Sequence, residues 1–205
     1  MGYIAGTLFG WESMARYANI VVEPPGPRAR KVVEQDRRYI ATTTKTSPVV
    51  AESASGGVVR DVDGNDLLDF ASGIAVMNVG HSHPRVVKAV QEQAERLFHF
   101  AGTDFYYSAQ VDLARRLASS VPGQCERKVF FSNSGTESIE AAMKLVRWNT
   151  GRERFIAFLG AFHGRTLGSL SLTASRPVQQ ERFFPTVPGA VHVPYASCYR
   201  CAYGM

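Results

Sequence analysis

Residues 128–148 read KVFFSNSGTESIEAAMKLVRW and are followed by RFIAF at 154–158. The short apolar run 128–131 is typical of a buried strand, 132–136 is a small polar turn, and apolar residues at helical spacing in 137–148 predict a helix. The run 154–158 predicts a second strand, and 191–193 a further one. A strand, a helix and a strand within about 30 residues form a βαβ unit, so the sequence predicts an α/β fold with a mostly parallel sheet covered by helices.

Upstream of this unit, the sequence predicts a β-hairpin. Val58 to Val62 is rich in valine and is typical of a strand, Asp63-Gly64-Asn65 is a turn sequence because these residues tolerate positive φ, and 67–70 is the returning strand. A helix is also predicted at 28–39. Pro84 suits a first helical turn, and apolar residues at helical spacing predict a helix from there to about 97 and another at 108–120. We therefore divide the chain into an N-terminal arm and hairpin segment, 1–75, and a segment 76–205 that holds the parallel sheet.

Composition excludes several classes of protein. The 205 residues are 45% hydrophobic and 20% charged, and no run reaches the length of about 18 apolar residues that a membrane span needs. The net charge of +5 is interspersed and has no zinc-finger or stacked-aromatic signature, so we expect no nucleic-acid or membrane partner. Three cysteines and the lack of a signal-peptide pattern predict a cytoplasmic protein without a disulfide framework.

The turn Ser134-Gly135-Thr136 is a candidate anion site. It stands where a predicted strand meets a helix N-terminus, so free backbone N–H groups and the positive end of the helix dipole converge there. Gly135 allows close approach of an oxyanion, and the two hydroxyls add donors. The glycine spacing matches neither a dinucleotide fingerprint nor a nucleotide-binding P-loop. The alternative is that Ser134 or Thr136 only caps the helix.

A second motif, Gly160-Ala161-Phe162-His163-Gly164-Arg165-Thr166, follows the strand at 154–158. Ligands bind at the carboxyl ends of parallel strands, where an aromatic ring, an imidazole and a guanidinium could stack on a ligand and clamp a carboxylate or phosphate. The residues alone allow an equally simple alternative, which is a glycine-rich turn with a core Phe and a surface Arg.

Together these residues resemble the class III pyridoxal-phosphate-dependent aminotransferases, of the ornithine, acetylornithine and 4-aminobutyrate type. The resemblance runs from about Gly26 to the end of the chain. It rests on the two site motifs and on three earlier motifs in the same order, DVDGN at 61–65, FASGIAV at 70–76 and GHSHP at 80–84. It implies fold type I, pyridoxal 5'-phosphate as cofactor, and a homodimer with the site at the subunit interface.

The resemblance also implies roles for individual residues. Ser134 and the backbone of Gly135 and Thr136 would hold the cofactor phosphate, and Phe162 would stack on the pyridine ring. His163, which lies beside the stacking ring of Phe162, would have a weaker role in cofactor binding. For substrate binding, Arg165 would pair with a carboxylate and Ile74 would line the pocket. The implied reaction moves an amino group from an ω-amino acid resembling 4-aminobutyrate to a 2-oxo acid, with acetylornithine or ornithine aminotransferase as the close alternatives.

One departure from the family affects catalysis. Family members are about twice as long, and the Lys that forms the Schiff base lies in the part that would follow Met205. We therefore expect an N-terminal fragment with no catalytic residue, containing the first half of the large domain and an incomplete sheet. The alternative is a non-catalytic remnant that still binds the cofactor. Two lesser patterns, Cys198-x-x-Cys201 and His81-x-His83, have too few ligands, and we expect no metal.

Overall fold

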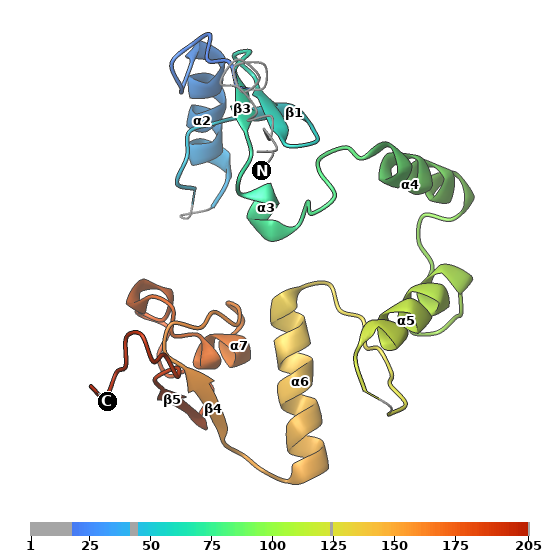
Figure 1. Ribbon diagram of the computed structural model, residues 1–205, viewed down its shortest axis with the longest axis vertical. Coiled ribbons are helices and arrows are strands. Elements are labelled where there is room, and N and C mark those ends of the chain that lie inside the picture. The colour runs from blue at the N-terminus through green and yellow to red at the C-terminus, as the bar shows by residue number, and fades with distance from the viewer. Residues whose placement is uncertain (1–17, 42–44, 124, 205) are drawn as a thin grey trace, which may run out of the picture. The chain divides into compact units, whose positions relative to one another are not determined.

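The computed structural model describes residues 18–41, 45–123 and 125–204 of the chain (Figure 1). It divides into two compact units, 1–105 and 106–205, which are described separately below. The first 17 residues of the predicted arm lie outside the described residues. The boundary at residue 75 falls inside the first unit, and the division into an arm and a large-domain segment remains a prediction.

The predicted hairpin is present in the first unit. Strand β2 (Val58–Asp61) pairs antiparallel with β3 (Asp66–Leu68) across the expected turn, where Gly64 has a φ of 92°. A strand that the pattern did not predict, β1 (Ala51–Ser55), pairs antiparallel with β2 and completes a sheet of order β1-β2-β3 (Figure 1). Four of its five residues are exposed and most are small, so its sequence lacks the alternation that would mark a strand.

Buried polar groups fix the hairpin turn. Asn65 is fully buried; its Oδ1 accepts the N–H groups of Val21 and Val22, both at 2.8 Å, and its Nδ2 donates to Asp61 Oδ2 at 2.7 Å. Burial alone would raise the pKa of Asp61, but the hydrogen bonds from Asn65 and from neighbouring backbone N–H groups hold that pKa below its usual value. The turn therefore contains an ionised and well-partnered carboxylate.

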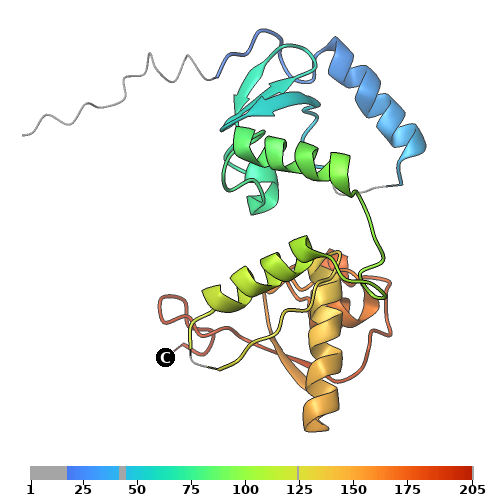
Figure 2. The ribbon, with the colours of Figure 1, turned by 90° about the vertical axis from the view of Figure 1, so that its right-hand side faces the viewer.

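Helix α2 (Pro27–Tyr39) confirms the predicted helix at 28–39 and lies beside the hairpin (Figure 2). The Asp63 carboxylate caps it from the turn, because Oδ1 accepts the N–H of Arg28 at 2.8 Å and Oδ2 accepts that of Ala29 at 2.9 Å. A negative charge at a helix N-terminus is stabilising. A Cβ at Gly26 would fall against the Asp63 carboxyl group, so the contact requires glycine there.

The motif at 70–76 forms a left-handed turn. Helix α3 (Ser72–Ala75) has φ values of 50°, 61°, 64° and 60° at its four residues, although only Gly73 is a glycine. Asp69 Oδ1 accepts the N–H groups of Ala71 and Ser72, both at 2.8 Å, and so holds the start of the turn. Helix α4 (Pro84–Arg96) follows and confirms the helix predicted from Pro84.

The second unit contains the parallel sheet. Helix α5 (Ser108–Ser120) has the predicted bounds, and α6 (Gly135–Thr150) begins two residues earlier than predicted. Strands β4 (Phe155–Phe158) and β5 (Ala190–Val193) pair in parallel, with Phe155 opposite Ala190, and both confirm predicted strands. Between them lie α7 (Leu167–Leu172) and the 3-10 helix Pro177–Gln179, which the pattern did not reveal. Helix α7 contacts both α6 and the two strands.

The core of the second unit lies where these elements meet. Met143 from α6, Ala157 from β4 and Leu172 from α7 are buried together, and Ile139, Phe155 and Ala190 pack around them. Large apolar side chains remain exposed on both units, among them Phe70, Phe98 and Trp148, each at least 90% exposed. Among the helices that the structure describes, none is long and apolar enough to cross a bilayer.

The prediction of a strand at 128–131 is wrong. These residues form no strand in the structure, and Phe130 is 76% exposed rather than buried. A β-strand is held by hydrogen bonds to a neighbouring strand, and the only parallel pair among the described residues is β4 with β5. The βαβ unit of the second unit is therefore β4-α7-β5, and 128–134 is an irregular segment that leads into α6.

Candidate active site

The two site motifs, which lie some 30 residues apart in the sequence, line one cavity of the second unit. The cavity has a volume of about 540 Å³. Helix α6 and the residue before it contribute one wall, and the loop that follows β4 contributes the other. The lining residues are Ser134, Gly135, Thr136, Ile139, Phe162, His163, Gly164 and Arg165. Every predicted cofactor-binding residue, and Arg165, is therefore in this set.

The α6 wall provides hydrogen-bond donors. Ser134 is the N-cap, and its hydroxyl accepts the N–H of Glu137 at 3.3 Å, so the predicted capping role is confirmed for this residue. The Glu137 carboxylate turns back to accept the N–H of Asn133 at 2.6 Å. The N–H groups of Gly135 and Thr136 donate to no residue that the structure describes. Two unused donors at the positive end of a helix can bind an anion.

The loop wall provides an aromatic ring and a cation. Phe162 is 52% exposed, so the alternative of a core Phe is wrong and the ring is accessible to a ligand. The backbone N–H of His163 donates to Thr173 Oγ1 at 3.0 Å, which anchors the loop beside α7. Arg165 is exposed, and it forms no hydrogen bond or ion pair with any described residue. A planar ring, donors for an anion and an unpaired guanidinium thus line the same cavity.

The two walls touch through small side chains. Thr136 Oγ1 lies 2.8 Å from Thr166 Oγ1 and 2.5 Å from Ser169 Oγ, so its hydroxyl is used within the fold. Gly164 has a φ of 134°, and a Cβ there would fall against Thr136 Oγ1 and Ser169 Oγ. Glycine at 164 is therefore required both by its backbone conformation and by the close approach of the loop to α6.

Sequence reasoning missed three residues of this region. Ile139 appeared as part of the apolar stripe of α6, yet it also lines the cavity. Glu140 and Ser169 connect α6 to α7 through hydrogen bonds described below. For Glu140, the sequence offered one signal. It adjoins Ile139, so a carboxylate stands next to the core-facing stripe of the helix. Nothing local marks Ser169.

Ile74 lies in the other compact unit. It is the third residue of the left-handed turn Ser72–Ala75, and its side chain is 91% exposed. The predicted role of Ile74 in the substrate pocket stays a prediction. His81, in the GHSHP loop, pairs with Asp69.

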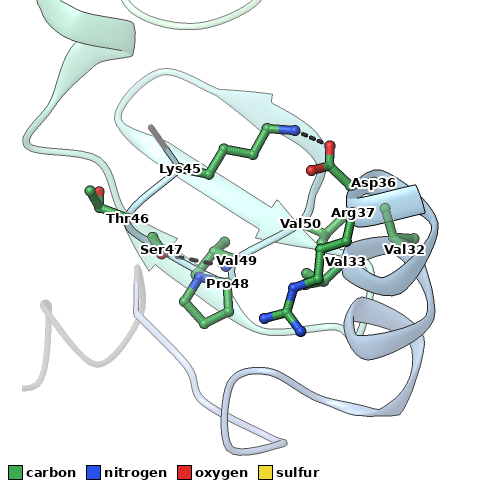
Figure 3. Close-up of a pocket in the computed structure, with 10 residues that line it drawn as sticks. All are labelled: Val32, Val33, Asp36, Arg37, Lys45, Thr46, Ser47, Pro48, Val49 and Val50. Carbon is green, nitrogen blue, oxygen red and sulfur yellow. Dashed lines mark hydrogen bonds and ion pairs between the residues drawn. The ribbon is translucent and has the colours of Figure 1, made fainter. Parts of the chain in front are cut away.

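The first unit has a cavity of its own. A cavity of about 550 Å³ lies between α2 and residues 45–50, where Lys45 pairs with Asp36 above the apolar side chains of Val32 and Val49 (Figure 3). Across the part of the chain that the structure describes, no group of three or more His, Cys, Asp or Glu side chains could hold a metal ion. All five Lys residues are described, and none lines the cavity at α6.

Comparison with known proteins identifies the family. The model of the family "Aminotransferase class-III" matches residues 39–203. Acetylornithine aminotransferase of Methanosarcina acetivorans is 44% identical over 86% of this chain and 44% of its own length. A probable 4-aminobutyrate aminotransferase of Bacillus subtilis is 38% identical over 76% of this chain and 36% of its own.

A solved structure agrees with these relatives. The ornithine aminotransferase of Toxoplasma gondii, which has partial occupancy of pyridoxal phosphate at its active site, superposes with a TM-score of 0.73 at 26% identity, over 82% of this chain and 40% of that one. This likeness confirms the predicted fold type I. The chain spans about two fifths of the length of the curated relatives it matches. By the match of the family model to most of its length, the chain belongs to the class-III aminotransferases.

Proposed function

We propose that this chain is the cofactor-binding portion of a pyridoxal-phosphate-dependent aminotransferase. The observation that carries the proposal is the single cavity that joins the unused N–H groups of Gly135 and Thr136 to the exposed ring of Phe162 and the unpaired Arg165. Class-III family membership supports the same reading. A dianionic phosphate ester on a flat aromatic ring fits these features, because one end needs donors and the other needs a stacking surface.

Each residue then has a distinct task. The backbone N–H groups of Gly135 and Thr136 bind the phosphate, and the Ser134 hydroxyl stands beside them at the helix end. Phe162 would stack on the pyridine ring, and His163 stands next to Phe162 in the same wall of the cavity. Arg165 holds a substrate carboxylate by charge and hydrogen bonding. When bound, the cofactor supplies an electron sink for chemistry at the carbon that carries the amino group.

For the substrates, we infer an ω-amino acid resembling 4-aminobutyrate as donor and a 2-oxo acid as acceptor. A relative named as a probable 4-aminobutyrate aminotransferase supports this inference. Acetylornithine and ornithine are the alternative donors, supported by the Methanosarcina relative and the Toxoplasma structure. All of these substrates carry a carboxylate, so Arg165 serves each of them and does not select one.

Two further properties belong to the proposal. We infer a cytoplasmic homodimer in which Ile74 reaches a substrate pocket. The exposure of Ile74 and of Phe70, each above 90%, leaves this turn available to another surface. The three cysteines argue against an oxidising compartment, because a small and odd number of cysteines does not suit a disulfide framework.

Catalysis needs an amine that this chain does not place at the site. None of the five Lys residues lines the cavity, so this chain would bind the cofactor without a covalent bond. The second candidate function, a non-catalytic remnant that binds the cofactor, rests on this observation. Reading the gene beyond the codon for Met205 separates the two. An in-frame continuation with a Lys in a short polar loop supports the enzyme, and a stop codon supports the remnant.

The binding claim is tested by titrating the 15N-labelled 205-residue chain with pyridoxal 5'-phosphate. We expect the amide signals of Gly135 and Thr136 to shift, and pyridoxal without the phosphate to leave them in place. Phe162→Ala should weaken binding by about two- to tenfold, since stacking on an aromatic ring is worth about 0.5–1.5 kcal/mol. Shifts confined to other amides, or a borohydride-trapped adduct on one specific Lys of this chain, would contradict the proposal.

A further inference from the structure

A carboxylate behind the cavity connects its two walls. Glu140 lies on α6, one turn beyond Thr136, and does not line the cavity itself. Its Oε1 accepts the hydroxyl of Thr166 at 2.5 Å and the backbone N–H of Ser169 at 3.0 Å. These two partners lie 26 and 29 residues further along the chain. The first turn of α7 has N–H groups without partners inside that helix, so Glu140 caps α7 from α6.

Three hydroxyl groups extend this connection to the cavity. Thr136 Oγ1 lies 2.8 Å from Thr166 Oγ1 and 2.5 Å from Ser169 Oγ. Each hydroxyl has one proton, and that of Thr166 is donated to Glu140. Because the Thr166 proton is used in this way, the Thr136 hydroxyl must donate across its 2.8 Å contact with Thr166. The Ser169 hydroxyl has three acceptors within reach, which are Thr136 Oγ1 at 2.5 Å, Thr166 Oγ1 at 3.0 Å and the Thr166 carbonyl at 3.2 Å. The carboxylate, which can only accept, therefore sets the donor direction from Thr136 to Thr166 to Glu140.

Close packing leaves this arrangement little freedom. A Cβ at Gly168 would fall onto the Glu140 carboxylate, and a Cβ at Gly164 would fall against Thr136 Oγ1. Ser169 is fully buried. Water poorly replaces the acceptor of the Ser169 N–H, because Ser169 is buried, so the loss of the Glu140 carboxylate leaves this N–H without a partner. Thr166 is exposed, and its hydroxyl can turn to water.

We propose that Glu140 is a positioning residue for the candidate site, which sets the loop of Phe162 and Arg165 at its distance from the first turn of α6. This inference rests on the proposed function, since it states what the network does for a ligand that spans both walls. A ligand that touches only the α6 N–H groups is indifferent to the loop. A ligand that must also stack on Phe162 is sensitive to it. The two kinds of ligand therefore separate positioning from general stability.

The test compares two probes on the 205-residue chain. Inorganic phosphate needs only the Gly135 and Thr136 amides, and pyridoxal 5'-phosphate needs the loop as well; both are followed by the shifts of these two amides. For Glu140→Ala we expect about a tenfold loss of affinity for pyridoxal phosphate and a change below about twofold for phosphate. Glu140→Gln keeps an acceptor oxygen and should restore most of the affinity. Glu153→Ala, which removes an exposed carboxylate of the same unit, is the matched control.

A second variant guards against a folding defect. Gly168→Ala keeps the Glu140 side chain but puts a methyl group where the Glu140 carboxylate lies. Alanine also suits a helix better than glycine does. It should reproduce the selective loss. Equal losses for both probes, or no loss in either variant, would overturn the proposal.

Amide hydrogen exchange decides the positioning claim without any ligand. The N–H of Ser169 should exchange about tenfold faster in Glu140→Ala than in the wild type, while Glu140→Gln and Glu153→Ala stay close to the wild type. If the wild type binds neither probe, the proposed function fails, and faster exchange at Ser169 still supports the link from Glu140 to the loop. Unchanged exchange at Ser169 would overturn that link.

Discussion

Asp69 Oδ2 lies 2.6 Å from His81 Nε2, and this contact joins two residues that lie on either side of the left-handed turn Ser72–Ala75 in the sequence. The other oxygen of Asp69 accepts the N–H groups of Ala71 and Ser72, which begin the turn. His81 is itself paired through its backbone with Gly56. The exposed Ile74 is thus carried on a strained turn that one carboxylate and one imidazole hold to the β-sheet.

The first prediction concerns acid stability. The hydrogen bond from His81, and then the N–H groups of Ser72 and Ala71, hold the pKa of Asp69 below its usual value against the opposing effect of burial. A carboxyl group with a lower pKa when folded stabilises the fold above its unfolded pKa, which is about 3.9, and this contribution is lost as the pH falls through the folded value. We expect Asp69→Asn to lower stability at pH 6 and to flatten its dependence on pH below about 4.

Urea unfolding at pH values from 2 to 6, followed by far-UV circular dichroism, measures this dependence. Asp112→Asn is the control, because among the described residues that exposed carboxylate contacts only Arg115 of its own helix, at 3.2 Å. It should keep the wild-type profile. A profile for Asp69→Asn that parallels the wild type would show that the Asp69–His81 contact does not form in solution.

The second prediction separates the two roles of Ser134. Ser134→Ala removes the N-cap acceptor of α6 and should lower the free energy of unfolding by about 1 kcal/mol. Ser120→Ala, which removes an exposed hydroxyl at the end of α5, should change it by less than about 0.5 kcal/mol. Both values come from urea unfolding of the 205-residue chain.

Ser134→Asp extends this prediction to binding. Aspartate is as good an N-cap as serine, so stability should be retained, but its charge would stand beside the amides that bind the phosphate. We expect affinity for pyridoxal 5'-phosphate to fall by about tenfold or more, with the loss reduced at high salt. Undiminished binding by this variant would place the phosphate away from the α6 N-terminus.

The third prediction concerns the closest approach between the two walls of the cavity. Gly164→Ala combines a φ of 134° with a Cβ against Thr136 and Ser169, and should cost about 2–4 kcal/mol. Gly135→Ala is the matched control from the same cavity. Nothing lies within 4 Å of a Cβ there, and the residue is helical, where alanine is more favourable than glycine, so the free energy of unfolding should stay unchanged or rise by up to about 1 kcal/mol. Equal stabilities for the two variants would mean that the loop does not pack on α6.

The fourth prediction concerns the hairpin turn. Asn65→Ala leaves the buried Asp61 carboxylate without its side-chain donor and the N–H groups of Val21 and Val22 without their acceptor. We expect a loss of about 2–4 kcal/mol in the first unit, measured by urea unfolding, and faster hydrogen exchange at Val21 and Val22. Asn78→Ala should be close to neutral, because the exposed Asn78 amide donates only to the Ala75 carbonyl within the part of the chain that the structure describes. Exchange unchanged at Val21 and Val22 would contradict the assigned acceptor.

Local signals in the sequence were sufficient for most of the helices and for the hairpin. Pro84 starts its helix as predicted, α2 begins at Pro27, one residue before the predicted start, and the turn at 63–65 has the geometry that its residues favour. These features depend on neighbours a few residues away. The site motifs are also local features of this kind. An N-cap residue and an adjacent glycine mark the start of a helix, whatever the position of that helix in the fold.

The sequence by itself determined the family and the helix whose N-terminus carries free N–H groups. It also determined which residues could bind a phosphate group and stack on an aromatic ring. Tertiary structure decided which strand pairs with which, and so it left 128–131 without a partner and made β4-α7-β5 the parallel unit. It also brought Glu140 to Thr166 and Ser169. Pairing between distant segments depends on three-dimensional packing, and no period in the sequence encodes it.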